Sequence, residues 1–299
     1  MNAPIQAVAD RSKFIGGSDV AAILGVSPWR NIVDLWADKV KPRVEDGSNT
    51  AAKRRGHRLE PYILDMIREE HGLTITRTNE RYIDSQLPFL AAEIDAEFSD
   101  ADGDHNIEIK TVHPFKAKEW GDIGTDSLPL HYVAQVQHGL GITGRDVCRV
   151  FALIGDDLKP YTVTRDDDLI RAMREQCEAF WNRYVVPKMQ PPIDYEAKNV
   201  LDTLKRLYPG TDGTVITATA MHEHWRAVYE TASEMQKKYA AVVDGAKAHL
   251  LADMGNSTAI EFADGLAFTR KEIRKKATTI HQPATRYIDF RLAKIKEQA

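Results

Sequence analysis

The chain is poor in cysteine and has no long apolar run, and each absence excludes a class of protein. Its 299 residues include two cysteines, Cys148 and Cys177, which stand far apart. Two isolated cysteines cannot build a cysteine-based zinc site or an iron–sulfur cluster, and they favour a reducing, cytoplasmic compartment. Without an apolar run of about 18 residues or a secretory signal pattern, no membrane span and no export are expected.

Positive charge is not in excess either, because the net charge is −4 at pH 7. Any contact with nucleic acid must therefore use local basic patches instead of the field of the whole molecule. Two patches are visible, residues 53–58 and residues 270–276, and each is also compatible with a solvated basic face. No Gly-Lys dipeptide occurs, which excludes the Walker A loop of a helicase.

The chain is long enough for one large domain or for one domain with an extension. Apolar spacing predicts helices over residues 16–40 (interrupted near Gly25), 50–71, 130–143 and 166–184. Short strands are predicted between them, at 74–77, 82–84, 88–98, 106–112, 147–154 and 159–164. Prolines at 187–192 end this pattern. We therefore expect a first domain over residues 1–195.

Residues 196–299 have a different pattern and are expected to form a C-terminal helical extension with a β-hairpin. Apolar residues recur at alternating steps of three and four from Trp225 to Leu250, which predicts a long helix. A hairpin is expected from Ile260, with its turn at Asp264-Gly265, and a last helix from Thr285. This extension could grip DNA through residues 270–276 or dock another protein.

Two short apolar runs in the middle of the chain end in acids. Residues 91–95 read Ala-Ala-Glu-Ile-Asp and residues 107–110 read Ile-Glu-Ile-Lys, with a polar turn between them. Because strand residues alternate faces, Glu108 and Lys110 project to the same side, and Asp95 can lie beside Glu108. Two carboxylates are suitable Mg²⁺ ligands. The neighbouring lysine can orient or deprotonate a water molecule, or neutralise charge on a phosphate.

Three further stretches support a nuclease. Residues 15–25 read Ile-Gly-Gly-Ser-Asp-Val-Ala-Ala-Ile-Leu-Gly, residues 55–60 read Arg-Gly-His-Arg-Leu-Glu, and residues 134–137 read Ala-Gln-Val-Gln. Together with the acids and lysine, and in this order, they resemble the YqaJ and lambda-exonuclease family of phage recombination nucleases. The similarity covers about residues 10–190. One departure is Glu93, which stands two residues before Asp95 where the PD-(D/E)xK superfamily has proline; only the acid is needed chemically.

The resemblance implies an α/β fold with a PD-(D/E)xK restriction-endonuclease-like core, in which a central mixed β-sheet is flanked by helices and followed by a helix–hairpin–helix extension. It also implies the metal ligands and catalytic residues. Asp95, Glu108 and the backbone carbonyl of Ile109 would bind Mg²⁺, for which Mn²⁺ could substitute, and Glu60 would complete the acidic cluster. Lys110 would position the attacking water.

The resemblance also assigns roles to a glutamine and to a phosphate pocket. Gln137 would face the site and hydrogen-bond the water or Lys110, and it is favoured over Gln135. Arg11 and Ser18 resemble the pocket for a 5′-terminal phosphate, which agrees with the preference of anions for helix N-termini and arginine. Arg55 is assigned with them as a DNA contact.

The implied activity is a Mg²⁺-dependent exonuclease that digests double-stranded DNA ends from 5′ to 3′. It would leave a 3′ single strand for a partner annealing protein, and members of the family can form trimeric rings. Two alternatives stay open. One is a structure-specific or restriction-like endonuclease on the same core, and the other is a DNA-binding protein with this fold but without catalysis.

Overall fold

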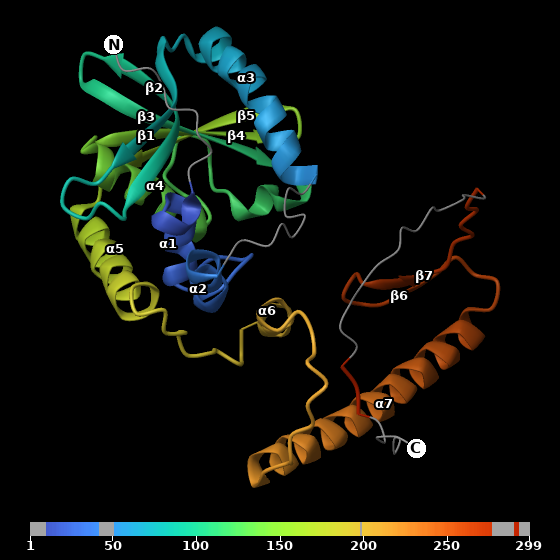
Figure 1. Ribbon diagram of the computed structural model, residues 1–299. Helices are drawn as coiled ribbons and strands as arrows, with labels where there is room; N and C mark the ends of the chain where they lie inside the picture. The colour runs from blue at the N-terminus through green and yellow to red at the C-terminus, as the bar shows by residue number, and fades with distance from the viewer. Residues whose placement is uncertain (1–9, 42–50, 198, 277–289, 293–299) are drawn as a thin grey trace. The chain divides into compact units, whose positions relative to one another are not determined.

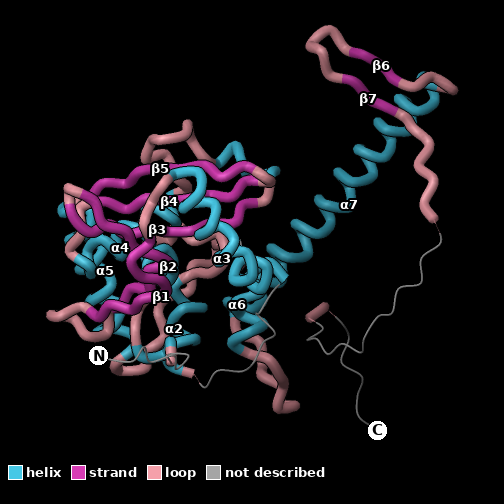
Figure 2. The backbone as a smooth tube through the Cα atoms, turned by 90° about the horizontal axis from the view of Figure 1, so that it is seen from above, coloured by secondary structure: helices cyan, strands magenta, loops and turns pink. Residues whose placement is uncertain are grey.

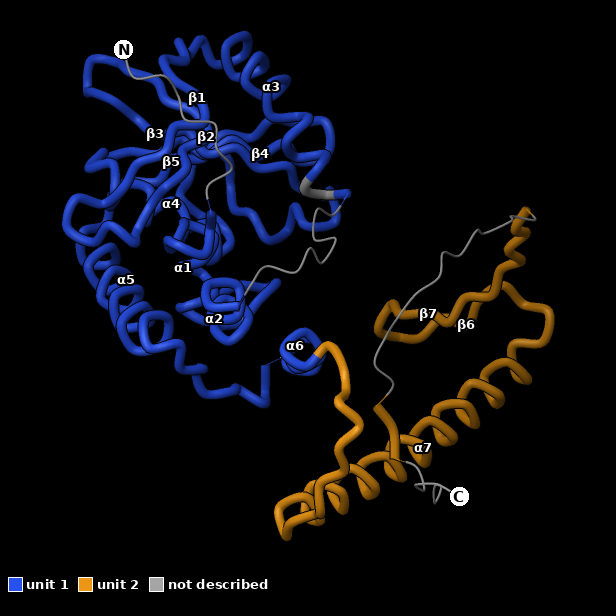
Figure 3. The backbone as a smooth tube through the Cα atoms, in the orientation of Figure 1, with its two compact units in different colours: residues 1–208 blue, residues 209–299 orange. Residues whose placement is uncertain are grey.

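The computed structural model describes residues 10–41, 51–197, 199–276 and 290–292. The chain divides into two compact units, residues 1–208 and residues 209–299 (Figure 3). The two units are described separately below.

A five-stranded sheet forms the centre of the first unit (Figure 1). Its strands lie in sequence order, as Figure 2 shows. All neighbouring strands are antiparallel except β3 and β4, which are parallel. Parallel neighbours need a crossover connection, and α4 (Leu130–Thr143) lies in that connection. The strands are β1 (Ile75–Ile83), β2 (Ala91–Asp100), β3 (Gly103–Val112), β4 (Val147–Ile154) and β5 (Asp157–Thr164).

Helices cover both faces of this sheet. The long helix α3 (Ala51–His71) packs Ile63, Leu64 and Ile67 against apolar side chains of β2, β3 and β4. The larger core lies on the other face, beneath α1 (Gly17–Ile23), α2 (Ile32–Val40), α4 and α5 (Asp167–Phe180). A π-helical turn, Trp181–Val185, continues α5. The predicted α/β architecture, a central mixed sheet flanked by helices, is confirmed.

The first unit extends past the predicted domain end at residue 195, because it includes α6 (Val200–Leu207). Thr203 accepts a hydrogen bond from Asn31 Nδ2 at 3.0 Å, and Arg206 donates to Asp34 at 2.6 Å. These contacts bind α6 to the N-terminal end of α2. A helix of eight residues carries little periodic signal of its own, so the prolines at 187–192 looked like the end of the domain.

The second unit contains the predicted long helix and hairpin. α7 (Ala220–Met254) is followed by β6 (Ala259–Glu261) and β7 (Ala267–Thr269), which pair antiparallel. The helix expected from Thr285 lies mostly outside the described residues. In the part of the chain that the structure describes, no helix is both long and apolar enough to cross a membrane.

Candidate active site

The predicted acids lie where two strands separate. β2 and β3 pair from Asp100 and Gly103 as far as Ala96 and Ile107. Beyond that point β2 continues only along β1, and β3 continues along β4. Asp95 and Glu108 are the next residues on the two arms of this fork. Strand separation therefore creates an opening in the sheet and places one carboxylate on each side of it.

Strand alternation sends Glu108 and Lys110 toward α4. Their neighbours Ile107 and Ile109 pack in the cluster beneath α3, so the side chains between them point to the opposite face. Glu108 accepts hydrogen bonds from Lys110 Nζ and, at 2.6 Å, from Gln135 Nε2 on α4. Asp95 accepts the backbone N–H of Ile109 at 2.8 Å. The fork thus brings Asp95, Glu108 and Lys110 together.

Burial shifts the pKa values of these charged side chains. Desolvation, reinforced by the negative charge of Asp95, raises the pKa of Glu108 to about 7. Desolvation also raises the pKa of Asp95, although Lys110 opposes this. Burial acts to lower the pKa of Lys110, but the carboxylates of Glu108 and Asp95 outweigh it and raise that pKa. Lys110 is therefore a cation that is bound to Glu108 and also acts on the nearby charge of Asp95.

The residues fit a divalent cation. Desolvation raises the pKa of both carboxylates, and the charge of Asp95 further raises that of Glu108. A cation between them would relieve this cost, and carboxylate oxygens are hard ligands. Within the described ranges, no three acidic, histidine or cysteine side chains already form a metal-binding cluster. The fit therefore depends on the pair of Asp95 and Glu108. The backbone carbonyl of Ile109 stays a predicted third ligand.

Glu60 approaches the pair from α3. Burial and the nearby charge of Asp95 raise the pKa of Glu60, whereas a side-chain hydrogen bond from Asn79 and the charges of His57 and Lys110 lower it. Its side chain is 19% exposed, and its carboxylate lies 4.0 Å from the largely exposed His57 imidazole. Glu60 is thus placed near Asp95, at the edge of the site.

The prediction for the two glutamines of α4 is wrong. Gln137 is buried away from the acids, where its Nε2 donates to the Thr164 carbonyl at 2.7 Å and its Oε1 accepts from Asp166 N–H at 3.0 Å. It connects α4 to the start of α5, and Gln135 is the residue that reaches Glu108. The two glutamines project about 200° apart on a helix. α4 is apolar on most sides, so its sequence does not indicate which face meets the acids.

The sequence analysis assigned no role to two residues near the site, Tyr132 and Gly17. Lys110 Nζ lies 5.0 Å from the centre of the Tyr132 ring, within the range of a cation–π contact. A Cβ built on Gly17 would lie 2.8 Å from Cγ of Gln135, so α1 can approach α4 closely only because residue 17 is glycine. The spacing of Tyr132 and Gln135, three residues apart on one helix, was a usable signal for a shared face.

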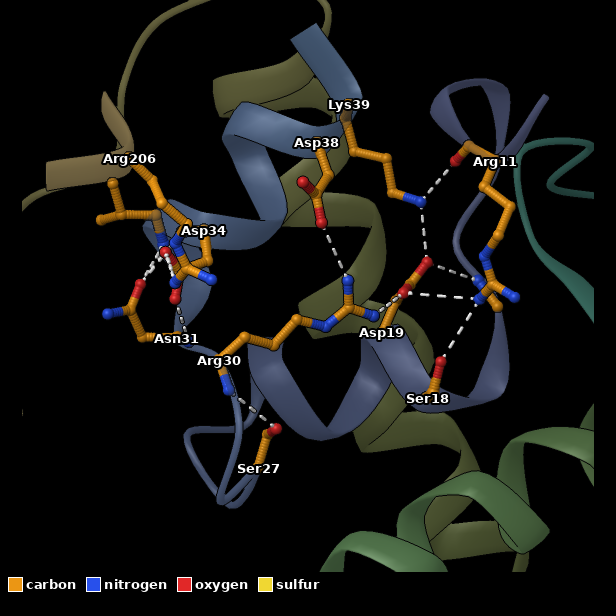
Figure 4. A network of polar contacts seen from close by, with 12 residues as sticks. Arg11, Ser18, Asp19, Ser27, Arg30, Asn31, Asp34, Asp38, Lys39 and Arg206 are labelled. Carbon is orange, nitrogen blue, oxygen red and sulfur yellow. Dashed lines mark hydrogen bonds and ion pairs between the residues drawn. The ribbon is translucent and has the colours of Figure 1, made fainter. Parts of the chain in front are cut away.

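Arg11 and Ser18 meet at the N-terminal end of α1. Arg11 Nη2 donates to Ser18 Oγ at 3.3 Å (Figure 4). Arg11 Nη1 lies 3.4 Å from Glu93. Both residues line a cavity that also reaches Glu108 and Gln135. One cavity therefore connects the predicted phosphate residues to Glu108.

A buried charge network lies behind this pair (Figure 4). Lys39 Nζ donates to Asp19 Oδ2 at 2.7 Å and to the Arg11 carbonyl at 2.6 Å. Asp19 also accepts the Gly16 N–H at 3.0 Å and pairs with Arg30. Burial acts to raise the pKa of Asp19, but the charges of Lys39, Arg30 and Arg11 outweigh it and lower that pKa to about 2. The sequence analysis missed Asp19 and Lys39 as supports of the pocket.

Arg55 lies elsewhere. It is exposed on α3, where it lines a surface hollow together with Arg54, Arg58 and Leu59. The structure places it on the same helix as Glu60, about one helical turn before that residue. Arg55 thus belongs to a basic surface of α3 and does not line the cavity of Arg11 and Ser18.

Comparison with known proteins gives consistent matches. Residues 8–146 match the YqaJ-like viral recombinase domain. The uncharacterized protein YqaJ of Bacillus subtilis (strain 168) is 29% identical over 238 residues, which cover 77% of this chain and 72% of that protein. The matched family range contains Arg11, Ser18, Glu60, Asp95, Glu108, Lys110 and Gln135.

Two solved structures are similar at low sequence identity. An alkaline exonuclease from Laribacter hongkongensis is 19% identical, with a TM-score of 0.49, and the match covers 66% of this chain and 96% of that one. A phage related exonuclease from Haemophilus somnus 129PT is 16% identical, with a TM-score of 0.45, and the match covers 59% and 96%.

Proposed function

We propose that this chain is a metal-dependent nuclease that digests double-stranded DNA from its ends, and the match of residues 8–146 to the YqaJ-like viral recombinase domain supports this proposal. The observation that supports this most strongly is the pair of desolvated carboxylates, Asp95 and Glu108, at the strand fork, with Lys110 bound to Glu108. Such a group is costly in a structural role, because buried like charges destabilise a fold. Perturbed pKa values of this kind cluster at functional sites.

Asp95 and Glu108 would hold Mg²⁺ or Mn²⁺, with Glu60 close by. The bound ion would neutralise charge on the phosphate that is cleaved. Without metal, Glu108 and Asp95 raise the pKa of Lys110, so this side chain is available as a cation. Its role is to orient the attacking water and to stabilise the negative charge that develops on the phosphate. Gln135 and the Tyr132 ring hold Glu108 and Lys110 in place.

The cavity of Arg11 and Ser18 supports 5′ to 3′ polarity. Arg11 contacts two acids, Glu93 and Asp19, and the Ser18 hydroxyl, and a terminal phosphate could replace the exposed Glu93 with a bidentate contact. Since the cavity continues to Glu108, a bound 5′ end would place the first phosphodiester bonds near the acids. Digestion in this direction leaves a 3′ single strand, which we propose is passed to an annealing protein during recombination.

Linear duplexes with a labelled 5′-phosphate or 5′-hydroxyl end, and a closed circle, test this proposal. We expect the protein to digest the linear duplexes only with Mg²⁺ or Mn²⁺, to prefer the phosphorylated end, and to leave the circle intact. Cleavage of the closed circle would instead identify an endonuclease. Binding of DNA without any cleavage in Mg²⁺ or Mn²⁺ would identify a binding protein.

A further inference from the structure

Trp29, in the loop between α1 and α2, leaves most of its large ring in the solvent. It is 64% exposed, whereas Trp36 on α2 is 6% exposed and donates its indole N–H to the Tyr184 carbonyl at 3.1 Å. A single exposed apolar side chain is common on a protein surface and needs no function by itself. A function of Trp29 must therefore follow from the residues around it.

A row of rings connects Trp29 to Lys110. The Trp29 ring meets the His131 ring edge to face, with 4.7 Å between their centres, and the His131 ring lies 4.0 Å from the Tyr132 ring. The centres of the Trp29 and Tyr132 rings are 6.3 Å apart, and Lys110 Nζ lies 5.0 Å from the centre of the Tyr132 ring. These last two distances limit the separation between the Trp29 ring and Lys110 Nζ to about 11 Å. That is the length of about three stacked nucleotides of one DNA strand, at about 3.4 Å each.

Hydrogen bonds hold the loop that carries Trp29. The backbone N–H groups of Trp29 and Arg30 donate to Ser27 Oγ at 3.3 and 3.4 Å. The Ser27 N–H donates to the Ala21 carbonyl of α1 at 3.0 Å, and the Arg30 side chain pairs with the buried Asp19. The backbone on both sides of the exposed ring is therefore tied to α1, so a ligand that binds the ring has little loop to order.

We propose that Trp29, supported by the His131 ring, is a stacking site for an unpaired base of the DNA strand that enters the active site. This inference rests on the proposed nuclease and assigns a subsite for its substrate. Because Glu108 is buried, we expect the duplex end to open so that one strand can bring a phosphate to the acids. An aromatic ring stacks with every base, so Trp29 would hold the opened strand without selecting its sequence.

DNA ligands that each lack one base test this role. The ligands are short duplexes whose phosphorylated 5′ strand has three unpaired nucleotides, one of which at a time is replaced by an abasic residue. Fluorescence anisotropy in Ca²⁺ measures their affinities. For the wild-type protein we expect abasic replacement at one position to weaken binding about tenfold, the size typical for loss of one stacked base. Trp29→Ala should bind the intact ligand about tenfold more weakly and lose the dependence on that base, whereas Trp29→Phe should keep the dependence.

Trp225→Ala is the matched control. Trp225 is 60% exposed and its ring also meets a histidine, His224, with 5.1 Å between the centres, but it lies on α7 of the second unit. This variant should keep the wild-type dependence on the base, whatever its overall affinity. If no abasic position matters for the wild-type protein, or if the same position matters equally for Trp29→Ala, the stacking role is overturned. A wild-type protein that shows the base dependence but cuts no DNA in Mg²⁺ would contradict only the nuclease proposal.

Discussion

Lys110 determines whether the two buried carboxylates can coexist at the fork. It is bound to Glu108, and its cation lowers the pKa of Asp95, which burial raises. Removal of one partner from a buried ion pair leaves charge uncompensated, which typically costs about 3–5 kcal/mol unless the remaining group takes up a proton. Glu108 can do so near neutral pH, because its pKa is already raised to about 7.

Replacement of Lys110 by alanine should therefore abolish cleavage while the protein stays folded and binds DNA. We expect a loss of at least about 10²-fold in the cleavage rate, because the variant lacks the cation that stabilises the transition state. A gel-shift assay measures DNA affinity in parallel. Lys116→Ala is the matched control, since Lys116 is exposed and pairs only locally with Glu119. Cleavage at the wild-type rate by Lys110→Ala would refute the assignment of the site.

The two glutamines of α4 should separate catalysis from stability. Gln135→Ala removes a hydrogen bond to Glu108 and should lower the cleavage rate with little effect on unfolding. Gln137→Ala leaves the Thr164 carbonyl and the Asp166 N–H without their partner, and should cost about 1–3 kcal/mol of stability. Cleavage assays and urea denaturation of both variants test this pair. If Gln137→Ala instead lowered the cleavage rate and Gln135→Ala lowered the stability, Gln137 would belong to the site.

The raised pKa of Glu108 predicts how stability without metal depends on pH. A carboxyl whose pKa is higher in the folded state binds more protons there than in the unfolded chain, so its contribution to stability falls as pH rises. The fall should extend from the unfolded pKa, about 4.3, to about 7. We expect Glu108→Gln to lose this slope. Thermal unfolding of both proteins in EDTA between pH 5 and 8 measures the difference, and equal slopes would contradict the burial of Glu108.

At the scale of elements, the fork between β2 and β3 explains which parts of the site the sequence could predict. Alternation along two strands joined by a tight turn is a local property, so Asp95, Glu108 and Lys110 were predictable from spacing alone. The side of α4 that faces them depends on packing over a long sequence separation, which is why Gln137 was chosen over Gln135.

β1 shows a second limit of prediction from sequence. Residues 74–77 and 82–84 were predicted as separate strands, but the structure has one strand, Ile75–Ile83, that passes through the left-handed Asn79. A polar segment between two apolar ends looks like a turn in the sequence. The strand forms because β2 supplies hydrogen-bond partners along nearly its whole length, and only the tertiary fold brings β2 there.

The buried network of Asp19 makes α1 and α2 one unit behind the phosphate cavity. Asp19→Asn would leave Lys39 and Arg30 without their buried anion, so we expect a loss of about 3–5 kcal/mol in stability. Asp38→Asn is the matched control, because Asp38 is exposed and pairs with the same Arg30; its cost should be below about 1 kcal/mol. Urea denaturation distinguishes the two. Equal losses would mean that Asp19 does not support the fold.

At the scale of the whole molecule, we expect the two units to have different roles: the first cleaves DNA, and the second contributes to DNA binding. Every residue of the two core clusters lies at or before Leu207, so the first unit has its own core. Exposed basic residues at 270–276 belong to the second unit. The net charge of −4 does not attract DNA over a distance, so such local patches must supply phosphate contacts.

Two truncations, which differ in the segment that contains α6, test these roles. A chain of residues 1–208 keeps α6 and should fold, cleave DNA ends, and bind DNA more weakly than the full chain. A chain of residues 1–195 loses the contacts of Thr203 and Arg206 with α2, and should melt at a lower temperature than the longer one. Circular dichroism and DNA-binding titrations at two salt concentrations measure these effects. If residues 1–208 fail to fold, the second unit is part of the core; if their DNA affinity is unchanged, it does not grip DNA.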